Sequence, residues 1–327
     1  MNLGLSLFGN LTVNEMSEIA VEAERSGFDS VWVAEGPGTD AFVACAEIAK
    51  NTSKIEIGTD IVSIYTRHPC VLASASASID LISKGRFRLG LGASHRSIVE
   101  NQLGLNFSKP VKRMEEAIQI VKTIIKSGTR PVNFNGEVFA ISEYSLWFDP
   151  FRDIIEIYLA AGGPQMTDLL AREADGSLFF LKSEEALKNA IQRISEISKR
   201  SSKHVPEIGV VMSCAFHEDG NLASRAARQT IAMYLVQYEA FRKSLGDQGF
   251  GDEVKKIMAA GNSIEAASKF VTSKMIEEFS LCGGKTEIKN KIGKCRSAGI
   301  DLLILEPCFF PGEKLAETLR RTIELAQ

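Results

Sequence analysis

The chain has 327 residues, of which 38 are basic and 41 acidic, giving a net charge of −3 with the histidines neutral. A nearly neutral chain lacks the basic face that binds phosphate backbones, which argues against a nucleic-acid partner. Hydrophobic residues make up 45% and charged residues 24%, the balance of a globular protein rather than of a disordered chain. At this length, two domains or one large α/β barrel are expected.

Neither a secretory signal nor a membrane span is predicted. The start of the chain has no basic segment followed by a long apolar run, and no run reaches the ~18 apolar residues that a span requires. The six cysteines are scattered without a Cys-x-x-Cys pair, so they are interpreted as reduced structural thiols. A cytoplasmic protein is expected.

Short apolar runs alternate with stretches of helical periodicity, which is the pattern of successive βα units around a parallel sheet. Thr12 and Glu15 form a predicted capping box at the first helix, which ends near Arg25 before Gly27. Further helices are predicted over residues 39–50, 69–83, 110–126, 164–174, 184–199, after 286, and from 312 onward. The predicted strands cover residues 3–8, 28–34, 54–59, 86–91, 154–161, 177–181, 208–216 and 301–305.

Eight strands in alternation with helices predict an α/β fold, a (β/α)8 TIM barrel that spans residues 1–327 as one domain. An open, doubly wound sheet is the alternative. Two segments interrupt the alternation. Residues 132–141, centred on Asn-Gly, predict a small hairpin because Asn-Gly suits a type I′ turn. Residues 222–278 are helical and polar and are interpreted as an insertion before the last strand.

In such a barrel the chemistry gathers where strands end and βα loops begin. Residues 160–166 (Ala-Ala-Gly-Gly-Pro-Gln-Met) lead from an apolar strand directly into a helix with proline in its first turn. Gly162 and Gly163 let the backbone approach a ligand closely, and the free N–H groups of a helix start bind anions. A phosphate site is predicted here, with an ordinary tight turn as the structural alternative.

Two other strand ends carry polar candidates. Residues 90–92 (Gly-Leu-Gly) begin like a G-x-G-x-x-G loop, but His95 replaces the last glycine and no acidic partner is evident ~20 residues further on. The loop can still receive a flat ring against its backbone, and His95 can act as an acid or a base. A solvated loop histidine is the alternative. Glu35, beside Gly-Pro-Gly at 36–38, is the second candidate, a carboxylate with room for a ligand.

For several other residues the sequence predicts structural roles. Arg67 and His68 precede a proline that can start a helix, which favours capping and loop anchoring. Trp32 and Trp147 are interpreted as core and surface packing residues. The four histidines lack the spacing of metal ligands, so no metal site is predicted. A Walker loop and a G-x-S-x-G elbow are also missing from the sequence.

These stretches, taken together, resemble the bacterial-luciferase-like superfamily, within the branch that uses the deazaflavin coenzyme F420. The methylenetetrahydromethanopterin reductases are the most similar group, and FMN-dependent monooxygenases share much of the pattern. The resemblance rests on residues 27–35 (Gly-Phe-Asp-Ser-Val-Trp-Val-Ala-Glu), 65–69 (Tyr-Thr-Arg-His-Pro), 85–93 (Gly-Arg-Phe-Arg-Leu-Gly-Leu-Gly-Ala) and 160–164 (Ala-Ala-Gly-Gly-Pro).

The resemblance implies a deazaflavin or flavin ring across the carboxyl-terminal mouth of the barrel. It also implies a non-prolyl cis peptide at Asp60–Ile61 that bulges against the ring. The cofactor tail would lie at the start of the helix at residue 164, with Lys182 beside its phosphate. The cofactor-binding residues implied are Asp60, Ile61, Val62, Gly92, Ala93, Ser94, Gly162, Gly163, Pro164, Gln165, Met166 and Lys182.

The chain departs from its relatives at four positions. The F420-dependent alcohol and sugar-phosphate dehydrogenases carry a histidine where this chain has Gly36, and a glutamate where it has Ala93. The methanopterin reductases carry an acidic residue within the first strand, matched by Ser6, and an aspartate matched by His95. The resemblance therefore does not assign a substrate.

The leading hypothesis is an F420-dependent oxidoreductase that moves a hydride between the deazaflavin and an unsaturated carbon or iminium of a small organic substrate. It includes action on CH–NH groups. Glu35 and His95 are the catalytic candidates, for proton handling or substrate contact. An FMN-dependent monooxygenase is one alternative, and a non-catalytic flavin-binding protein is another. A homodimer is implied by the resemblance, and neither a nucleic-acid nor a membrane partner is expected.

Overall fold

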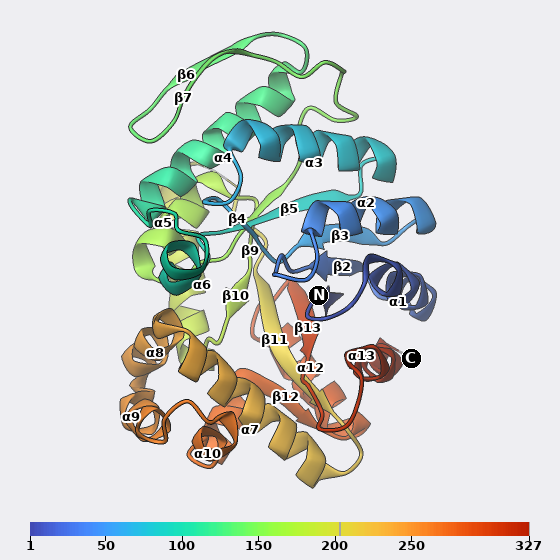
Figure 1. Cartoon of the computed structure of the whole chain (residues 1–327), viewed down its shortest axis with the longest axis vertical. Coiled ribbons are helices and arrows are strands. Elements are labelled where there is room, and N and C mark those ends of the chain that lie inside the picture. Colours follow the sequence, from blue (N-terminus) through green and yellow to red (C-terminus); the bar gives the residue numbers. More distant parts are fainter. Residues whose placement is uncertain (203, 327) are drawn as a thin grey trace.

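The computed structural model describes residues 1–202 and 204–326 and confirms the predicted barrel (Figure 1). Its ring consists of β1 (Asn2–Leu7), β2 (Ser30–Val33), β3 (Glu56–Thr59), β5 (Phe87–Gly92), β8 (Ile157–Leu159), β9 (Gly176–Ser177), β10 (Phe179–Phe180), β11 (Gly209–Phe216) and β13 (Leu302–Pro307). Neighbouring strands are parallel in the order β1, β2, β3, β5, β8, β9, and the order β10, β11, β13 leads back to β1. Only Leu178 separates β9 from β10, so the two act as one interrupted strand and the ring closes.

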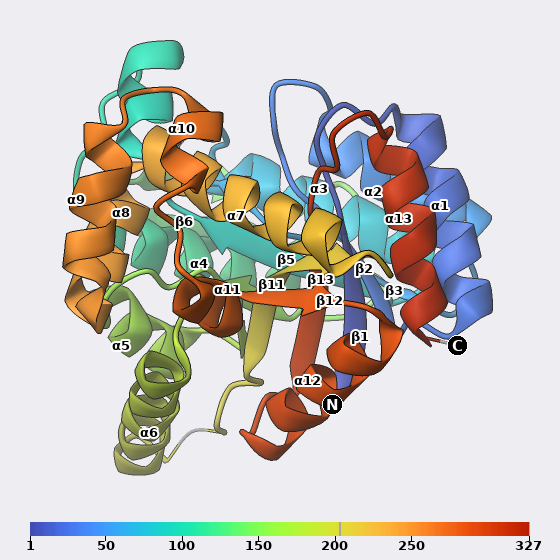
Figure 2. The same cartoon turned by 90° about the horizontal axis from the view of Figure 1, so that it is seen from below.

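Helices cover the outside of the ring (Figures 1 and 2). Each helix from α1 to α6 packs on the next, and α13 packs on α1. The predicted capping box is present, since Thr12 caps α1 together with Glu15 and Gly27 ends it with φ of 93°. The bounds are α1 (Val13–Ser26), α2 (Ala41–Asn51), α3 (Pro69–Ser83), α4 (Pro110–Ser127), α5 (Pro164–Glu173), α6 (Glu184–Arg200), α12 (Lys285–Ser297) and α13 (Leu315–Ile323).

The interior of the barrel is filled with large rings. Trp32 and Tyr158 meet edge to face, with their centroids 5.0 Å apart. Glycines on neighbouring strands leave the room for them, because a Cβ at Gly58 or at Gly176 would lie 2.3 Å from the ring of Trp32 or Tyr158, respectively. Trp32 is therefore a core residue as predicted. Trp147 is 97% exposed, so the prediction that it packs on the surface was wrong.

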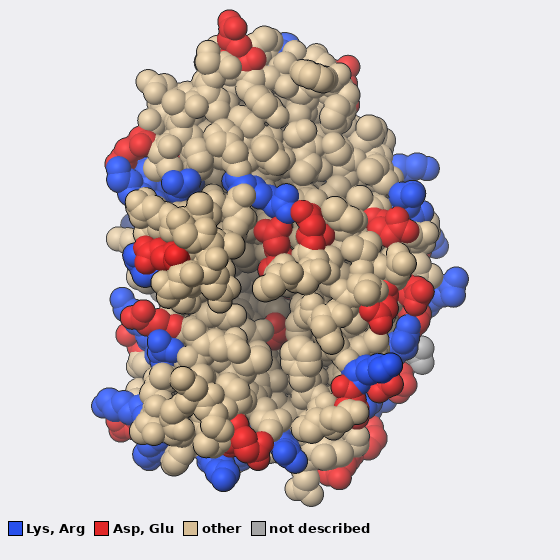
Figure 3. Space-filling view, viewed as in Figure 1, with Lys and Arg blue, Asp and Glu red and all other residues tan. Residues whose placement is uncertain are grey.

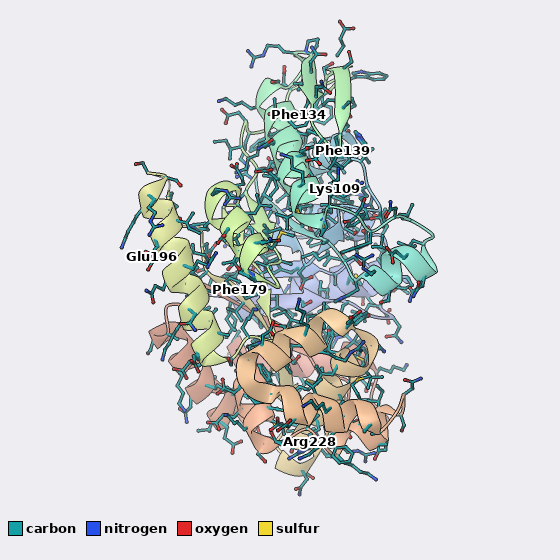
Figure 4. The ribbon with its side chains drawn as sticks, turned by 90° about the vertical axis from the view of Figure 1, so that its left-hand side faces the viewer. Lys109, Phe134, Phe139, Phe179, Glu196 and Arg228 are labelled. Atoms are coloured by element: carbon teal, nitrogen blue, oxygen red, sulfur yellow. The ribbon has the colours of Figure 1, made fainter. Side chains whose placement is uncertain are left out.

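A two-stranded hairpin stands outside the ring beside α4. Its strands β6 (Val132–Asn135) and β7 (Ala140–Tyr144) are antiparallel. Figure 4 shows Phe134 and Phe139 at this end of the molecule and Phe179 near its centre. The hairpin lies in the predicted segment, but its turn is longer than the two-residue type I′ turn that Asn-Gly predicts.

A buried carboxylate explains the longer turn. Glu116 of α4 is 1% exposed, and its oxygens accept N–H groups from Glu137, Val138 and Phe139 at 2.7, 2.9 and 2.9 Å. A Cβ at Gly136 would lie 2.3 Å from the Glu116 side chain. The carboxylate therefore satisfies three backbone donors, which an isolated type I′ turn would leave to water.

Glu116→Ala is expected to lower the free energy of unfolding by about 2–4 kcal/mol, because three partly buried N–H groups lose a charged acceptor. Urea unfolding followed by circular dichroism measures the change. Glu115→Ala is the matched control, since Glu115 lies on the same helix and pairs with the partly exposed Lys112. Equal stabilities of the two variants would contradict the anchoring role of Glu116.

The region between the last two ring strands is mostly helical. It contains α7 (Gly220–Gln237), α8 (Glu239–Leu245), α9 (Gly251–Ala259), α10 (Ile264–Ser268) and α11 (Ser273–Phe279). These helices share an apolar cluster of their own, which includes Ile231 and Phe279. An additional strand, β12 (Ser280–Gly283), follows them and pairs with β11. Within residues 1–202 and 204–326, no helix has the length and apolar character needed to cross a membrane.

Candidate active site

The ends of β13, β1 and β3 bring two carboxyl groups toward the same serine. Ser6 is near the end of β1 and is 1% exposed. Its Oγ donates to Oδ2 of Asp60, which follows β3, at 2.7 Å. On β13, Leu305 is in register with Leu5 of β1. The residues that follow them, Glu306 and Ser6, therefore lie side by side. The carboxyl-terminal mouth of the barrel therefore contains two acids around one hydroxyl.

The Asp60–Ile61 peptide is cis, as the resemblance implied. The Ile61 side chain packs against β5, because a Cβ at Gly92 would lie 2.5 Å from it. Val62 follows in the short strand β4 (Val62–Ser63), which pairs with Leu91 and Gly92 of β5. Asp60, Ile61, Val62 and Gly92, predicted separately as ring contacts, are thus adjacent.

Asp60 is the most strongly perturbed acid of the mouth. Burial raises its pKa well above the ordinary range, and the neighbouring Glu306 raises it further, against the opposing hydrogen bond from Ser6. Its second oxygen, Oδ1, is buried and accepts no hydrogen bond within the described residues. Since buried polar atoms are normally paired, the missing partner sets this carboxyl apart from the other acids of the mouth.

Glu306 was not singled out from the sequence. Its Oε1 accepts from the hydroxyl of Tyr234 at 2.5 Å, and its Oε2 accepts from Ser213 at 3.1 Å. Burial raises its pKa against these two hydrogen bonds. The sequence signal was available, because Glu306 ends the apolar strand Leu-Leu-Ile-Leu in the way that Glu35 ends the second strand.

His95 lies in the loop after β5, within a group of rings. Its imidazole stacks on Tyr238 with centroids 3.9 Å apart and planes at 16°, and it meets the edge of Phe241. Burial lowers the pKa of His95 to about 4, so the ring is neutral near pH 7. Its Nδ1 is buried without a partner in the described chain. Ser94, just before it, has a φ of 58°, and Ala93 is half-buried.

Glu35 is already paired. Its Oε1 accepts from Nη2 and Nε of Arg67 at 2.5 and 3.1 Å, and Arg67 also binds Asp40 at 2.7 Å. His68 caps α3 by accepting from the Cys70 N–H. Arg67 and His68 therefore have the anchoring and capping roles predicted for them, and Glu35 is held by a guanidinium rather than free.

The start of α5 is open. Gly163 is its N-cap and offers no side-chain cap, and a Cβ at Gly162 or Gly163 would meet nothing within 4 Å. Pro164 and Gln165 are exposed, whereas Met166 packs partly on the core. Lys182, which follows β10, donates to the Gly162 carbonyl at 3.0 Å, and burial lowers its pKa. An uncapped helix start beside an ammonium group suits an anion.

The predicted residues therefore form two groups rather than one. One group comprises the acids, the cis peptide and the glycines of β5. The other comprises the start of α5, which follows β8, and Lys182, which follows β10. Figure 3 shows that the centre of this face is hollowed and that acidic side chains lie within the hollow. In the part of the chain that the structure describes, no three His, Cys, Asp or Glu side chains are grouped as metal ligands.

Comparison with known proteins identifies the family. The profile of the luciferase-like monooxygenase family matches residues 2–302. A 5,10-methylenetetrahydromethanopterin reductase from Archaeoglobus fulgidus is 27% identical over 326 residues, which cover 96% of each chain. A second relative of that name, from Methanolobus tindarius, is 23% identical over 97% of each chain.

A solved structure shares the fold throughout. The coenzyme F420-dependent tetrahydromethanopterin reductase of Methanopyrus kandleri superposes with a TM-score of 0.84 at 21% identity and covers 99% of this chain and 97% of its own. Because the family profile matches almost the whole barrel, the chain belongs to the luciferase-like monooxygenase family.

Proposed function

We propose that the chain is an F420-dependent oxidoreductase that moves a hydride between the deazaflavin and an unsaturated or iminium carbon of a small organic substrate. Full-length relatives named as methylenetetrahydromethanopterin reductases support this proposal. The observation that carries it is the pairing of the β3 end, where the Ile61 side chain packs on Gly92, with an open anion site at α5. The first suits a flat ring, and the second suits a phosphate-bearing tail.

On the ring side, the segment after β3 supplies Asp60, Ile61 and Val62, and the end of β5 with the loop that follows it supplies Gly92, Ala93 and Ser94. When bound, the deazaflavin accepts or donates a hydride at its C5 carbon. The apolar side chain of Ile61, fixed against Gly92, would support the ring face and exclude water from it. Asp60 offers an unpaired oxygen at the same edge.

On the tail side, the backbone donors at Gln165 and Met166 and the ammonium of Lys182 would bind the phosphate, with Gly162, Gly163 and Pro164 giving it room. The Lys182 ammonium already points to this turn through its 3.0 Å contact with Gly162. A charge-assisted bond in a partly buried place is stronger than one in water.

Lys182→Ala is expected to weaken F420 binding by about ten- to a hundredfold, the loss of one hydrogen bond to a charged group. Calorimetric titration measures the dissociation constant. Lys188→Ala is the control, because Lys188 lies on the neighbouring helix α6 and pairs with Glu184 at 2.7 Å. An unchanged affinity in the Lys182 variant would remove this residue from the site.

Glu35 and His95 are proposed substrate contacts. The neutral imidazole of His95 can offer its buried Nδ1 to a polar group of the substrate, and the rings of Tyr238 and Phe241 hold it in place. Glu35 would contact the substrate while Arg67 fixes its carboxylate. Action on CH–NH groups is part of the proposal and is supported by the names of the relatives.

FMN is the second candidate cofactor. A type II Baeyer–Villiger monooxygenase from Pseudomonas putida, solved in complex with FMN, has a TM-score of 0.74 at 18% identity. With FMN the same mouth would serve oxygen insertion instead of hydride transfer to an organic substrate.

Turnover separates the two reactions. Protein mixed with reduced F420 and a panel of imines and activated alkenes should restore the absorbance of oxidised deazaflavin, and deuterium at C5 should appear in the product. Oxygen consumption with reduced FMN, and no oxidation of reduced F420 by any compound of the panel, would overturn the proposal.

We also propose a homodimer in the cytoplasm. Helix α3 exposes Val71, Leu81 and Ile82 at 51, 47 and 42%, and its only charged residue, Asp80, is buried. Such an apolar face suits a second copy. The free cysteines of the described chain fit a reducing compartment. Sedimentation should give a dimer for the native chain and a monomer for Ile82→Lys; a native monomer would refute it.

A further inference from the structure

The geometry of the mouth points to the charge of the substrate. We propose that Asp60 and Glu306 together bind a positively charged nitrogen of the substrate, an ammonium or iminium group. This inference rests on the proposed function, since it assigns the substrate class of the same site. It is carried by three observations: two acids share one small region, no cation accompanies them, and a wall of aromatic rings adjoins them.

The two acids converge through their partners. Asp60 reaches Ser6 of β1 at 2.7 Å, and Glu306 of β13 follows Leu305, the neighbour of Leu5 on β1. Glu306 in turn binds Ser213 of β11 and Tyr234 of α7. The pair and its partners therefore come from four elements and the segment after β3, but Oδ1 of Asp60 receives none of the donors. A donor from a ligand can complete this set.

Among the residues that the structure describes, no Lys, Arg or His pairs with either acid. The groups that act on the Asp60 carboxyl are Ser6, its own backbone and Glu306, and those that act on Glu306 are Tyr234 and Ser213. The nearby thiols of Cys45 and Cys308 are buried with raised pKa values and so are neutral. Two acids without a counter-ion favour a ligand that brings positive charge.

Two other shielded carboxylates of the chain have an arginine. Asp80, which is fully buried, pairs with Arg152 at 2.9 Å, and Glu35 pairs with Arg67 at 2.5 Å. The mouth pair thus lacks the arginine that Asp80 and Glu35 have.

Aromatic rings adjoin Glu306. The ring of Tyr234 contacts Phe180 at 4.8 Å and Phe241 at 5.5 Å between centroids. Phe241 leads on to Tyr238 and His95. A planar organic group would lie against these rings while its charged nitrogen meets the acids, and the ring faces add to the attraction for a cation.

Binding of such a cation is expected to release protons from the carboxyl groups. A protonated carboxyl that meets an ammonium group ionises, so one proton leaves the site for the buffer for each carboxyl that ionises. A neutral ligand of the same shape leaves the carboxyl protonated and releases no proton. Proton release therefore reports the charge pairing without any turnover.

The test compares benzylamine, which is protonated at pH 7, with benzyl alcohol, which is neutral and similar in shape. Calorimetric titrations of the full chain with each compound, in two buffers of different ionisation enthalpy, measure affinity and proton release. The native protein should bind benzylamine at least about tenfold more tightly and release protons only with it. Asp60→Asn and Glu306→Gln should each lose most of this preference.

Glu207→Gln is the matched control. Glu207 is also shielded, has a pKa raised mainly by burial and accepts from a tyrosine hydroxyl, Tyr158, but it precedes β11 at the opposite end of the barrel. This variant should keep the preference for benzylamine.

Equal binding of the two compounds by the native protein, or an undiminished preference in the Asp60 and Glu306 variants, would overturn the inference. Titration of the same samples with F420 separates the two proposals. F420 binding without a preference for the cation refutes the acid pair alone, whereas a preference for the cation without F420 binding refutes the cofactor assignment alone.

Discussion

Replacing Gly90 by alanine is expected to lower the free energy of unfolding by more than about 4 kcal/mol, which for most domains of this size removes much of their stability. A Cβ at this position would lie 1.7 Å from the carbonyl oxygen of Thr59 on β3. No rotation of a side chain relieves that overlap, because both groups belong to the backbone. Thr59 also joins the two strands by accepting from the Gly90 N–H and donating to its carbonyl.

Soluble yield and urea unfolding measure the effect. Gly293→Ala is the control, because Gly293 is exposed within α12 and a Cβ there meets nothing within 4 Å. Alanine in the middle of a helix should stabilise the protein by about 0.5–1 kcal/mol. A Gly90 variant as stable as the native chain would show that β3 and β5 can separate, which is incompatible with a tightly closed ring.

Replacing Asp60 by asparagine is expected to stabilise the protein at pH 8 and to impair its reaction. The folded state raises the pKa of Asp60, so it binds a proton more tightly than the unfolded chain does. The stability due to this group is complete below the ordinary aspartate pKa and is lost as the pH rises through the folded value. Asparagine cannot ionise and avoids the loss.

The gain should be about 1–3 kcal/mol at pH 8, the cost of burying an unsatisfied polar group, and should shrink toward pH 4. Urea unfolding of both proteins at several pH values measures it. Turnover with F420 should fall by about ten- to a hundredfold, the loss of one charged partner of the bound substrate. A variant that is less stable than the native protein at pH 8 would contradict the placement of Asp60 in a site that trades stability for function.

Much of the barrel could be predicted, because most ring strands are apolar runs followed by a stretch whose apolar residues recur with helical periodicity. The strand expected over residues 177–181 is interrupted at Leu178, which no local pattern announces. The turn of the outer hairpin was also missed. It depends on Glu116, about twenty residues earlier in the chain, so that Asn-Gly alone could not decide its length.

The site was predicted less completely, because its chemistry depends on which strands are neighbours. Asp60 and Ile61 were identified through the resemblance, and the cis peptide is present. The partner of Asp60, Glu306, lies more than two hundred residues away and meets it only because β13 closes the ring beside β1. Glu35 is predicted as a carboxylate with room for a ligand, and its pairing with Arg67 across the βα loops depends on contacts that the sequence does not show.

The central claim is that the mouth of this barrel holds F420. Calorimetric titration of the purified protein with F420 and, separately, with FMN tests it most directly. The account predicts micromolar or tighter binding of F420 and at least about a hundredfold weaker binding of FMN, a difference of about 2.7 kcal/mol. Preference for FMN would contradict the account in favour of a monooxygenase, and binding of neither would contradict both cofactor assignments.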